Sequence, residues 1–151
     1  MPKKPHPKKV PKFDLRNRPD TAKEPRIGVS LEGATNPVWR FSHMDWDGPW
    51  CPSKCKDSGI REVLARLANF ESMSWQQIHS GTGSHVVDVT GIIKEARDRI
   101  IHLKKEEWAD NLCSLRMCGK ERLWGFLRSG IFHLLWWDPE HQVFPSKKKN
   151  T

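Results

Sequence analysis

The stretch NLCSLRMCGKERLWGFLRSGIFHLLWW, residues 111–137, decides the fold, because its apolar residues alternate instead of recurring at helical spacing. Residues 112–117, 121–128 and 131–137 are typical of strands, separated by Cys-Gly-Lys at 118–120 and Ser-Gly at 129–130. Connections of three and two residues are common in hairpins, so we expect an antiparallel meander. A further short strand is expected at 142–144, after the Asp138-Pro139 turn.

These turn lengths set a register in which cross-strand partners share a face of the sheet. The expected pairs are Arg116 with Arg122, Ser114 with Trp124, Phe126 with His133, and Arg122 with Trp137. One face then combines cations with aromatic rings: Arg116, Arg122, Arg128 and His133 among Trp124, Phe126 and Trp137. The other face is an apolar core surface made of Cys113, Leu115, Met117, Leu123, Leu127, Phe132, Leu134 and Trp136.

Upstream residues favour helices that would cover this apolar face. Apolar spacing predicts one helix over 59–70 and a second over 92–103, the latter capped by Thr90. Ser74 and Gln77 form a capping box before a short helical turn that the glycines at 81–83 end. Residues 38–44 alternate as an edge strand would. We expect an α+β fold with helices on one face of a small twisted antiparallel sheet.

Length and charge limit the organisation and the partners. The chain has 151 residues and a net charge of +8, which suits one domain and a polyanionic partner. Residues 1–37 hold seven prolines and nine Lys or Arg, so we expect a disordered basic tail before one domain at 38–151. No stretch is apolar enough to span a membrane, and a cytoplasmic location without membrane partners is expected.

The four cysteines leave two interpretations open. They occur as Cys51-x3-Cys55 and Cys113-x4-Cys118, which resemble metal-binding pairs but lack the two-residue spacing of the strongest zinc patterns. They could instead be reduced thiols, some of them small core residues. We expect that the protein uses no metal and no cofactor.

The basic and aromatic face suits single-stranded nucleic acid, since arginines contact phosphates and bases stack on rings. The nucleic-acid-binding candidates are Arg128, Trp124, Phe126, Trp137, Lys147, Lys148 and Lys149. RNA cleavage without a metal needs a base, an acid and cations around the phosphate. His133 and His141 could supply the first two, with Arg116 and Arg122 as part of the clamp. Alternatively, His141 buttresses the Asp-Pro turn and His133 is a half-buried strand residue.

The order of two helices followed by this meander resembles the RelE, ParE and HigB toxin superfamily over about residues 90–144. The resemblance implies that Arg116 and Arg122 bind and polarise the scissile phosphate of mRNA on the ribosome, and that a late histidine acts as acid or base. It also implies an antitoxin partner. The chain departs from the family because it has no tyrosine, which many cleaving members use. Its ending, WWDPEHQVFPSKKKNT, resembles small proteins carried on mobile elements.

Two hypotheses follow from these patterns. In the first, the protein is a toxin-like endoribonuclease, an mRNA interferase that cleaves by metal-independent acid/base chemistry at Arg116, Arg122, His133 and His141. In the second, it is a binding module without catalysis, which contacts nucleic acid, the ribosome or a protein through the same face. The missing tyrosine favours the second hypothesis, and histidines beside arginines favour the first.

Overall fold

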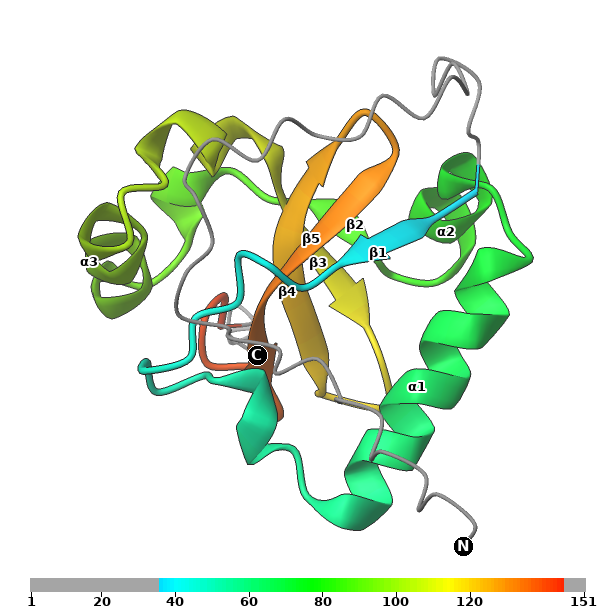
Figure 1. Ribbon diagram of the computed structural model, residues 1–151. Helices are drawn as coiled ribbons and strands as arrows, with labels where there is room; N and C mark the ends of the chain where they lie inside the picture. The colour runs from blue at the N-terminus through cyan, green and yellow to red at the C-terminus, as the bar shows by residue number, and fades with distance from the viewer. Residues whose placement is uncertain (1–35, 146–151) are drawn as a thin grey trace, which may run out of the picture. The chain divides into compact units, whose positions relative to one another are not determined.

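A computed structural model describes residues 36–145, which form an α+β unit built on a mixed five-stranded sheet (Figure 1). The strands are β1 (Val38–Arg40), β2 (His85–Val86), β3 (Leu112–Arg116), β4 (Arg122–Arg128) and β5 (Ile131–Asp138). The α-helices are α1 (Asp57–Glu71), α2 (Trp75–Gly81) and α3 (Lys94–His102), with 3-10 turns η2 (Pro52–Lys54), η3 (Val89–Gly91) and η4 (Glu106–Asn111). Most of the expected tail, and Lys147, Lys148 and Lys149, lie outside the described residues.

The expected meander of β3, β4 and β5 is confirmed, and local turn chemistry explains it. A backbone hydrogen bond of 3.0 Å from Met117 N to Glu121 O closes the first connection. In the second, Ser129 and Gly130 have φ values of 51° and 76°, the left-handed pair that a type I′ turn needs. The pairs Arg116 with Arg122, Ser114 with Trp124, and Phe126 with His133 are present as predicted.

The predicted pair of Arg122 with Trp137 was wrong, because β5 contains a bulge. Trp124 lies opposite Trp136 but Gly125 lies opposite Leu134, so β5 has one extra residue there. Beyond the bulge the faces exchange, because side chains alternate along a strand. Arg122 therefore faces Asp138 and not Trp137. Trp136 joins the core on the α3 side of the sheet, whereas Trp137 joins the core on the α1 side.

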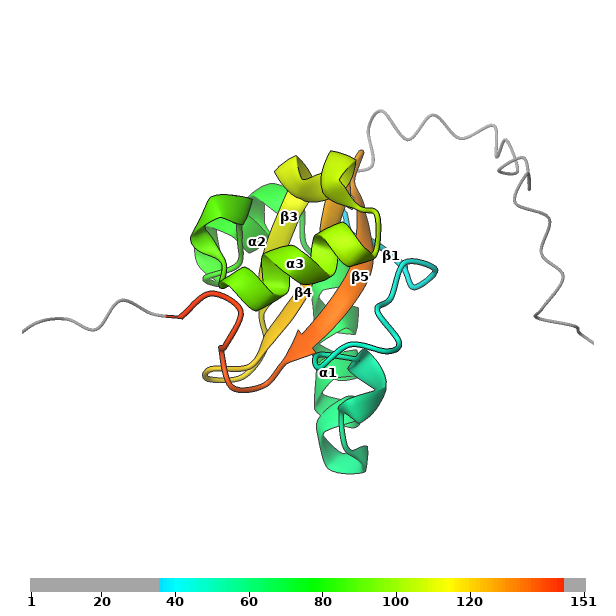
Figure 2. The same ribbon diagram turned by 90° about the vertical axis from the view of Figure 1, so that its left-hand side faces the viewer.

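Helices cover both faces of the sheet, which corrects the expectation of helices on one face. The apolar stripe of α1 and Ile78 of α2 pack on Cys113, Leu115 and Phe132, the face predicted as core. The stripe of α3 packs instead on the opposite face, against Trp124, Phe126 and Trp136 (Figures 1 and 2). The sheet is thus the middle layer of three, and its basic and aromatic face is largely filled by a second core.

Several boundaries differ from the expected ones. The strand predicted at 38–44 is shorter, and as β1 it forms the predicted sheet edge but runs parallel to β5. Residues 142–144 are not a strand, although Ile93 N donates a 3.0 Å hydrogen bond to Val143 O. The capping box at Ser74 and Gln77 is present as predicted. The expected cap at Thr90 was wrong, since Asp88 accepts from Thr90 N and caps η3.

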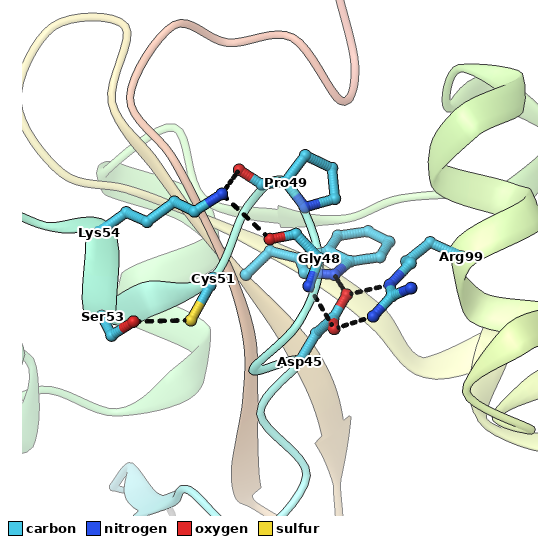
Figure 3. Close-up of polar contacts among 8 residues, drawn as sticks. Asp45, Gly48, Pro49, Cys51, Ser53, Lys54 and Arg99 are labelled. Carbon is cyan, nitrogen blue, oxygen red and sulfur yellow. Dashed lines mark hydrogen bonds and ion pairs between the residues drawn. The ribbon is translucent and has the colours of Figure 1, made fainter.

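The segment 41–51 runs along the outer side of β5 and is held there by an ion pair whose carboxylate is buried. Asp45 N donates to Leu135 O at 3.2 Å, and Trp137 N donates to Trp50 O at 2.8 Å. The Asp45 carboxylate accepts two hydrogen bonds from Arg99 of α3, at 2.6 and 2.7 Å (Figure 3). Trp136 Nε1 and Gly48 N complete its shell at 3.0 and 3.1 Å. This carboxylate joins the segment to α3.

Candidate functional site

The middle of the predicted nucleic-acid-binding face is not accessible. Trp124 and Phe126 are fully buried, and His133 is only 5% exposed. Trp137, on the opposite face, is buried as well. The expectation that these rings stack on bases was therefore wrong, because α3 and η4 cover Trp124 and Phe126, and Trp137 lies in the core on the α1 side.

The same face becomes accessible at the hairpin between β3 and β4. There, Arg116 is exposed and Arg122 is half-buried. His85 of β2 pairs with Ser114 of β3 and therefore lies on this face too. His141, from the turn after β5, interacts electrostatically with His85 and both arginines. These four residues, His85, Arg116, Arg122 and His141, are named the Arg116–His141 cluster.

Backbone contacts position the two arginines. Arg116 N donates to the buried Ser84 hydroxyl at 3.0 Å, which aligns β3 with the chain before β2. Arg122 Nη1 donates to Gly119 O at 2.7 Å and to Glu121 O at 3.0 Å. The guanidinium of Arg122 is therefore held against the turn, and Arg116 lies directly across the ladder from it.

Asp138 builds the turn that presents His141. Its buried carboxylate accepts from Gln142 N at 2.8 Å, from Val143 N at 2.9 Å and from Trp124 Nε1 at 3.4 Å. These bonds fold residues 138–143 back on the sheet, and His141 takes a left-handed φ of 57° within them. A non-glycine residue is seldom found in that conformation, so the turn holds His141 at some conformational cost.

The surroundings of the cluster keep His141 neutral near pH 7. Partial burial lowers its pKa from 6.5, and the positive charge of Arg122 lowers it further. The carboxylate of Asp138 acts in the opposite direction without reversing the shift. Burial and the neighbouring Arg116 also lower the pKa of Arg122, although a guanidinium stays charged at any working pH. The cluster therefore pairs fixed cations with an imidazole able to accept a proton.

His133 belongs to a second group, the His43–His133 cluster, which consists of His43, Lys105, Trp108, Arg128 and His133. Lys105 Nζ donates to His43 Nδ1 at 2.7 Å, and the two imidazole rings lie 5.3 Å apart. Arg128 stacks over the Trp108 ring at 4.3 Å, while His133 meets that ring edge-on at 4.8 Å. Burial first, then Lys105 and Arg40, lower the pKa of His43.

The two clusters lie at opposite ends of the sheet. His133 precedes Asp138 by five positions on β5, which corresponds to roughly 15 Å at the rise of a strand. The structure therefore brings together Arg116, Arg122 and His141 of the predicted site and separates them from His133 and Arg128. His85 was missed, because a two-residue strand leaves no alternating pattern to detect.

In the described part of the chain, the cysteines do not belong to a metal-ligand cluster, although Cys113 Sγ lies 3.9 Å from His79 Nε2. All four have free thiols, and among residues 36–145 no group of three or more His, Cys, Asp or Glu side chains could hold a metal ion. Burial raises the pKa of the Cys113 thiol to about 12, so this thiol stays protonated as a core residue. Within the same residues, no helix has the length and apolar character needed to cross a membrane.

Comparisons with known proteins identify no relative of this chain. No protein-family model, curated protein or solved structure matches it. The structure itself defines an α+β protein with a mixed five-stranded sheet and a cationic cluster at one end of that sheet.

Proposed function

We propose that the protein is a toxin-like endoribonuclease that binds an RNA phosphodiester in the Arg116–His141 cluster. The observation that carries this proposal is the convergence of two arginines and two histidines from β2, β3, β4 and the 138–143 turn. Arginine is suited to phosphate because its planar fork can donate two parallel hydrogen bonds. Imidazoles beside such a clamp supply proton transfer near neutral pH.

The proposed reaction is an internal transesterification. Neutral His141 removes the proton from the ribose 2′-OH, the 2′-oxygen attacks phosphorus, and the bond from phosphorus to the 5′-oxygen breaks. His85 gives a proton to that departing oxygen. Arg116 and Arg122 stabilise the charge that develops on the non-bridging oxygens. The products are a 2′,3′-cyclic phosphate and a 5′-hydroxyl, and no metal or cofactor takes part.

Cleavage of a 5′-labelled single-stranded oligoribonucleotide tests this reaction, alone and as mRNA bound to bacterial ribosomes. We expect 2′,3′-cyclic phosphate ends, and no cleavage where the 2′-hydroxyl is methylated. His141→Gln and His85→Gln should each slow cleavage by about 10²- to 10⁴-fold, the usual contribution of a general acid or base. His102→Gln, an exposed histidine of α3, serves as the matched control and should cleave normally. Full activity in both cluster variants would refute histidine catalysis.

The toxin part of the proposal rests on the resemblance of residues 90–144 to ribosome-dependent toxins. Induced expression in a bacterial host should then arrest growth, and Arg116→Gln with His141→Gln should abolish the arrest. Unchanged arrest in the double variant, at equal protein level, would assign the toxicity to another part of the chain.

A second candidate is a binding module without catalysis that holds RNA, the ribosome or an acidic protein. The fixed Arg122 guanidinium favours it, because its hydrogen bonds to two backbone carbonyls position the charge to bind an anion even without catalysis. The same oligoribonucleotide separates the two candidates. If binding depends on Arg116 and Arg122 but neither free nor ribosome-bound RNA is cleaved, the protein is a binding module without catalysis.

A further inference from the structure

The connection between α2 and β2 is anchored on both sides by hydroxyl groups. Thr82 Oγ1 donates to Ile78 O at 2.7 Å, at the end of α2, and it lies 2.8 Å from Ser84 Oγ. Ser84 is fully buried, and its Oγ accepts a hydrogen bond from Arg116 N at 3.0 Å. The two hydroxyls therefore join the end of α2 to β3 and hold the residue between them in place.

That residue is Gly83, which lies against the side chain of Arg116. Its φ of 77° is in the left-handed region, which glycine adopts without steric cost. A Cβ at Gly83 would lie 3.1 Å from Arg116 Cδ and 3.3 Å from Arg116 Nη1. Both distances are shorter than ordinary van der Waals contact, so a side chain here would have to displace the guanidinium. The position of the Arg116 charge therefore depends on glycine at position 83.

The carbonyl group of Gly83 contacts the second member of the cluster, His85. His85 Nδ1 lies within hydrogen-bond distance of Gly83 O, at 3.3 Å. A carbonyl oxygen can only accept, so Nδ1 carries the proton of this bond. The bond is compatible with the neutral ring and with the imidazolium, because Nδ1 is protonated in both. The nitrogen at which His85 gains and loses a proton is therefore Nε2.

We propose that Gly83 is a positioning residue of the Arg116–His141 cluster: its missing side chain sets the place of the Arg116 guanidinium, and its carbonyl sets the tautomer of His85. The inference rests on the proposed function, in which Arg116 binds the scissile phosphate and His85 protonates the departing 5′-oxygen. It adds that Nε2 of His85 delivers this proton. A histidine whose other ring nitrogen bonds to a carbonyl has a defined tautomer and ring orientation. Gly83 thus aligns the cation with the acid.

Gly83→Ala tests this proposal, with Gly130→Ala as the matched control. Gly130 has nearly the same left-handed φ, 76°, but it lies in the turn between β4 and β5, at the opposite end of the sheet from the cluster. Both substitutions force alanine into an unfavourable backbone conformation, and Gly83→Ala in addition places a Cβ against Arg116. Inorganic phosphate is the probe. It is titrated into the isotope-labelled full chain, and the Nε–H signal of Arg116 is followed by NMR.

We expect Gly83→Ala to shift the Arg116 signal and to weaken phosphate binding about tenfold, the loss of one hydrogen bond to a charged group. Gly130→Ala should bind phosphate as the wild type does. Cleavage of the oligoribonucleotide should slow about 10²-fold in Gly83→Ala, as it does when a reacting group is misplaced by about 1 Å. If Gly83→Ala does not fold, Gly83→Asn replaces it, since Asn tolerates the left-handed conformation and still adds a Cβ. Equal phosphate affinity in the variants at 83 and 130 would overturn the effect on Arg116.

The tautomer of His85 is a readout that needs neither phosphate binding nor cleavage. With the ring neutral, the ring nitrogen chemical shifts of the wild type should show a protonated Nδ1 and an unprotonated Nε2. Gly83→Ala should populate the other tautomer, whereas His102, exposed on α3, should be the same in both proteins. A wild-type ring protonated at Nε2 would overturn the role of the Gly83 carbonyl. If the wild type binds no phosphate, the proposed function fails, and the tautomer still decides whether Gly83 sets the ring of His85.

Discussion

The imidazole of His141 acquires its properties from neighbours that are distant in sequence. Its pKa is lowered by burial and then by Arg122, with smaller effects from His85 and Arg116 against the opposing charge of Asp138. Because the folded-state pKa lies below 6.5, the unfolded chain takes up the proton first as pH falls. The stability that neutral His141 contributes is therefore lost as pH falls from 6.5 to the lower pKa of the folded state.

NMR titration of the His141 ring should reveal this shift and its cause. In the wild type, the midpoint should lie below 6.5, and Arg122→Gln should raise it because a nearby positive charge is gone. Added inorganic phosphate should also raise it, since a bound dianion favours the imidazolium. A midpoint that neither Arg122→Gln nor phosphate moves would mean that His141 is not part of an anion site.

The position of the segment 41–51 depends on the carboxylate of Asp45. Burial opposes its ionisation, but hydrogen bonds from Arg99, Trp136 and Gly48 N outweigh burial and leave its pKa below 3.8. The ionised carboxylate thus stabilises the fold fully above pH 3.8, and this stabilisation is lost as pH falls through the pKa of the folded state. Because the Asp45 side chain is fully buried, the pair with Arg99 is costly to break from either side.

Asp45→Asn should lower the free energy of unfolding by about 3 kcal/mol, because Arg99 is left beside an uncharged group. Urea unfolding at neutral pH measures the difference. Asp98→Asn is the matched control, since it breaks an exposed ion pair with Lys94 on the same helix and should have no measurable effect. Equal midpoints for the two variants would show that the Asp45 pair adds nothing to stability.

At the scale of the element, the β5 bulge determines which side chains enter which core. Gly125 lies opposite it, and a Cβ there would overlap His133 O and the ring of Phe132. Gly125→Ala should therefore destabilise the protein by about 1–3 kcal/mol, the usual cost of overpacking a core. Gly81→Ala is the control, because a Cβ at Gly81 meets no atom within 4 Å. Thermal unfolding of both variants would test this, and equal midpoints would contradict the close approach.

Elements defined by neighbouring residues were predictable. The Ser74 capping box, the stripe of α1 and both hairpins depend on contacts a few positions apart, and all are present. The bulge, the parallel β1 and the face chosen by α3 depend on distant partners, and the sequence pattern did not reveal them. Likewise, the pairing of Arg116 with Arg122 follows from a short turn and was predicted, whereas His133 was assigned to an exposed surface that α3 in fact covers.

At the scale of the whole molecule, the charge of +8 predicts salt-sensitive binding to RNA. The observed affinity should fall with salt, and Arg116→Gln should reduce the slope of log affinity against log salt by about 0.7, the value for one lost single-strand phosphate contact. Arg61→Gln, at an exposed position of α1, gives the same net charge as Arg116→Gln and should reduce the slope less. Fluorescence anisotropy with a labelled oligoribonucleotide measures both. Identical slopes would mean that net charge alone governs binding.

The parallel pairing of β1 with β5 has a consequence for how the chain is made. Val38 pairs with Ile131, and Asp45 contacts Trp136 across 91 positions. Neither contact can form until the translating ribosome has released the last strand, so the early third of this unit waits without its partners. Such distant pairing slows folding and leaves apolar segments exposed meanwhile. We therefore expect nascent chains arrested before residue 131 to depend on chaperones, and to become protease-resistant only after β5 has emerged.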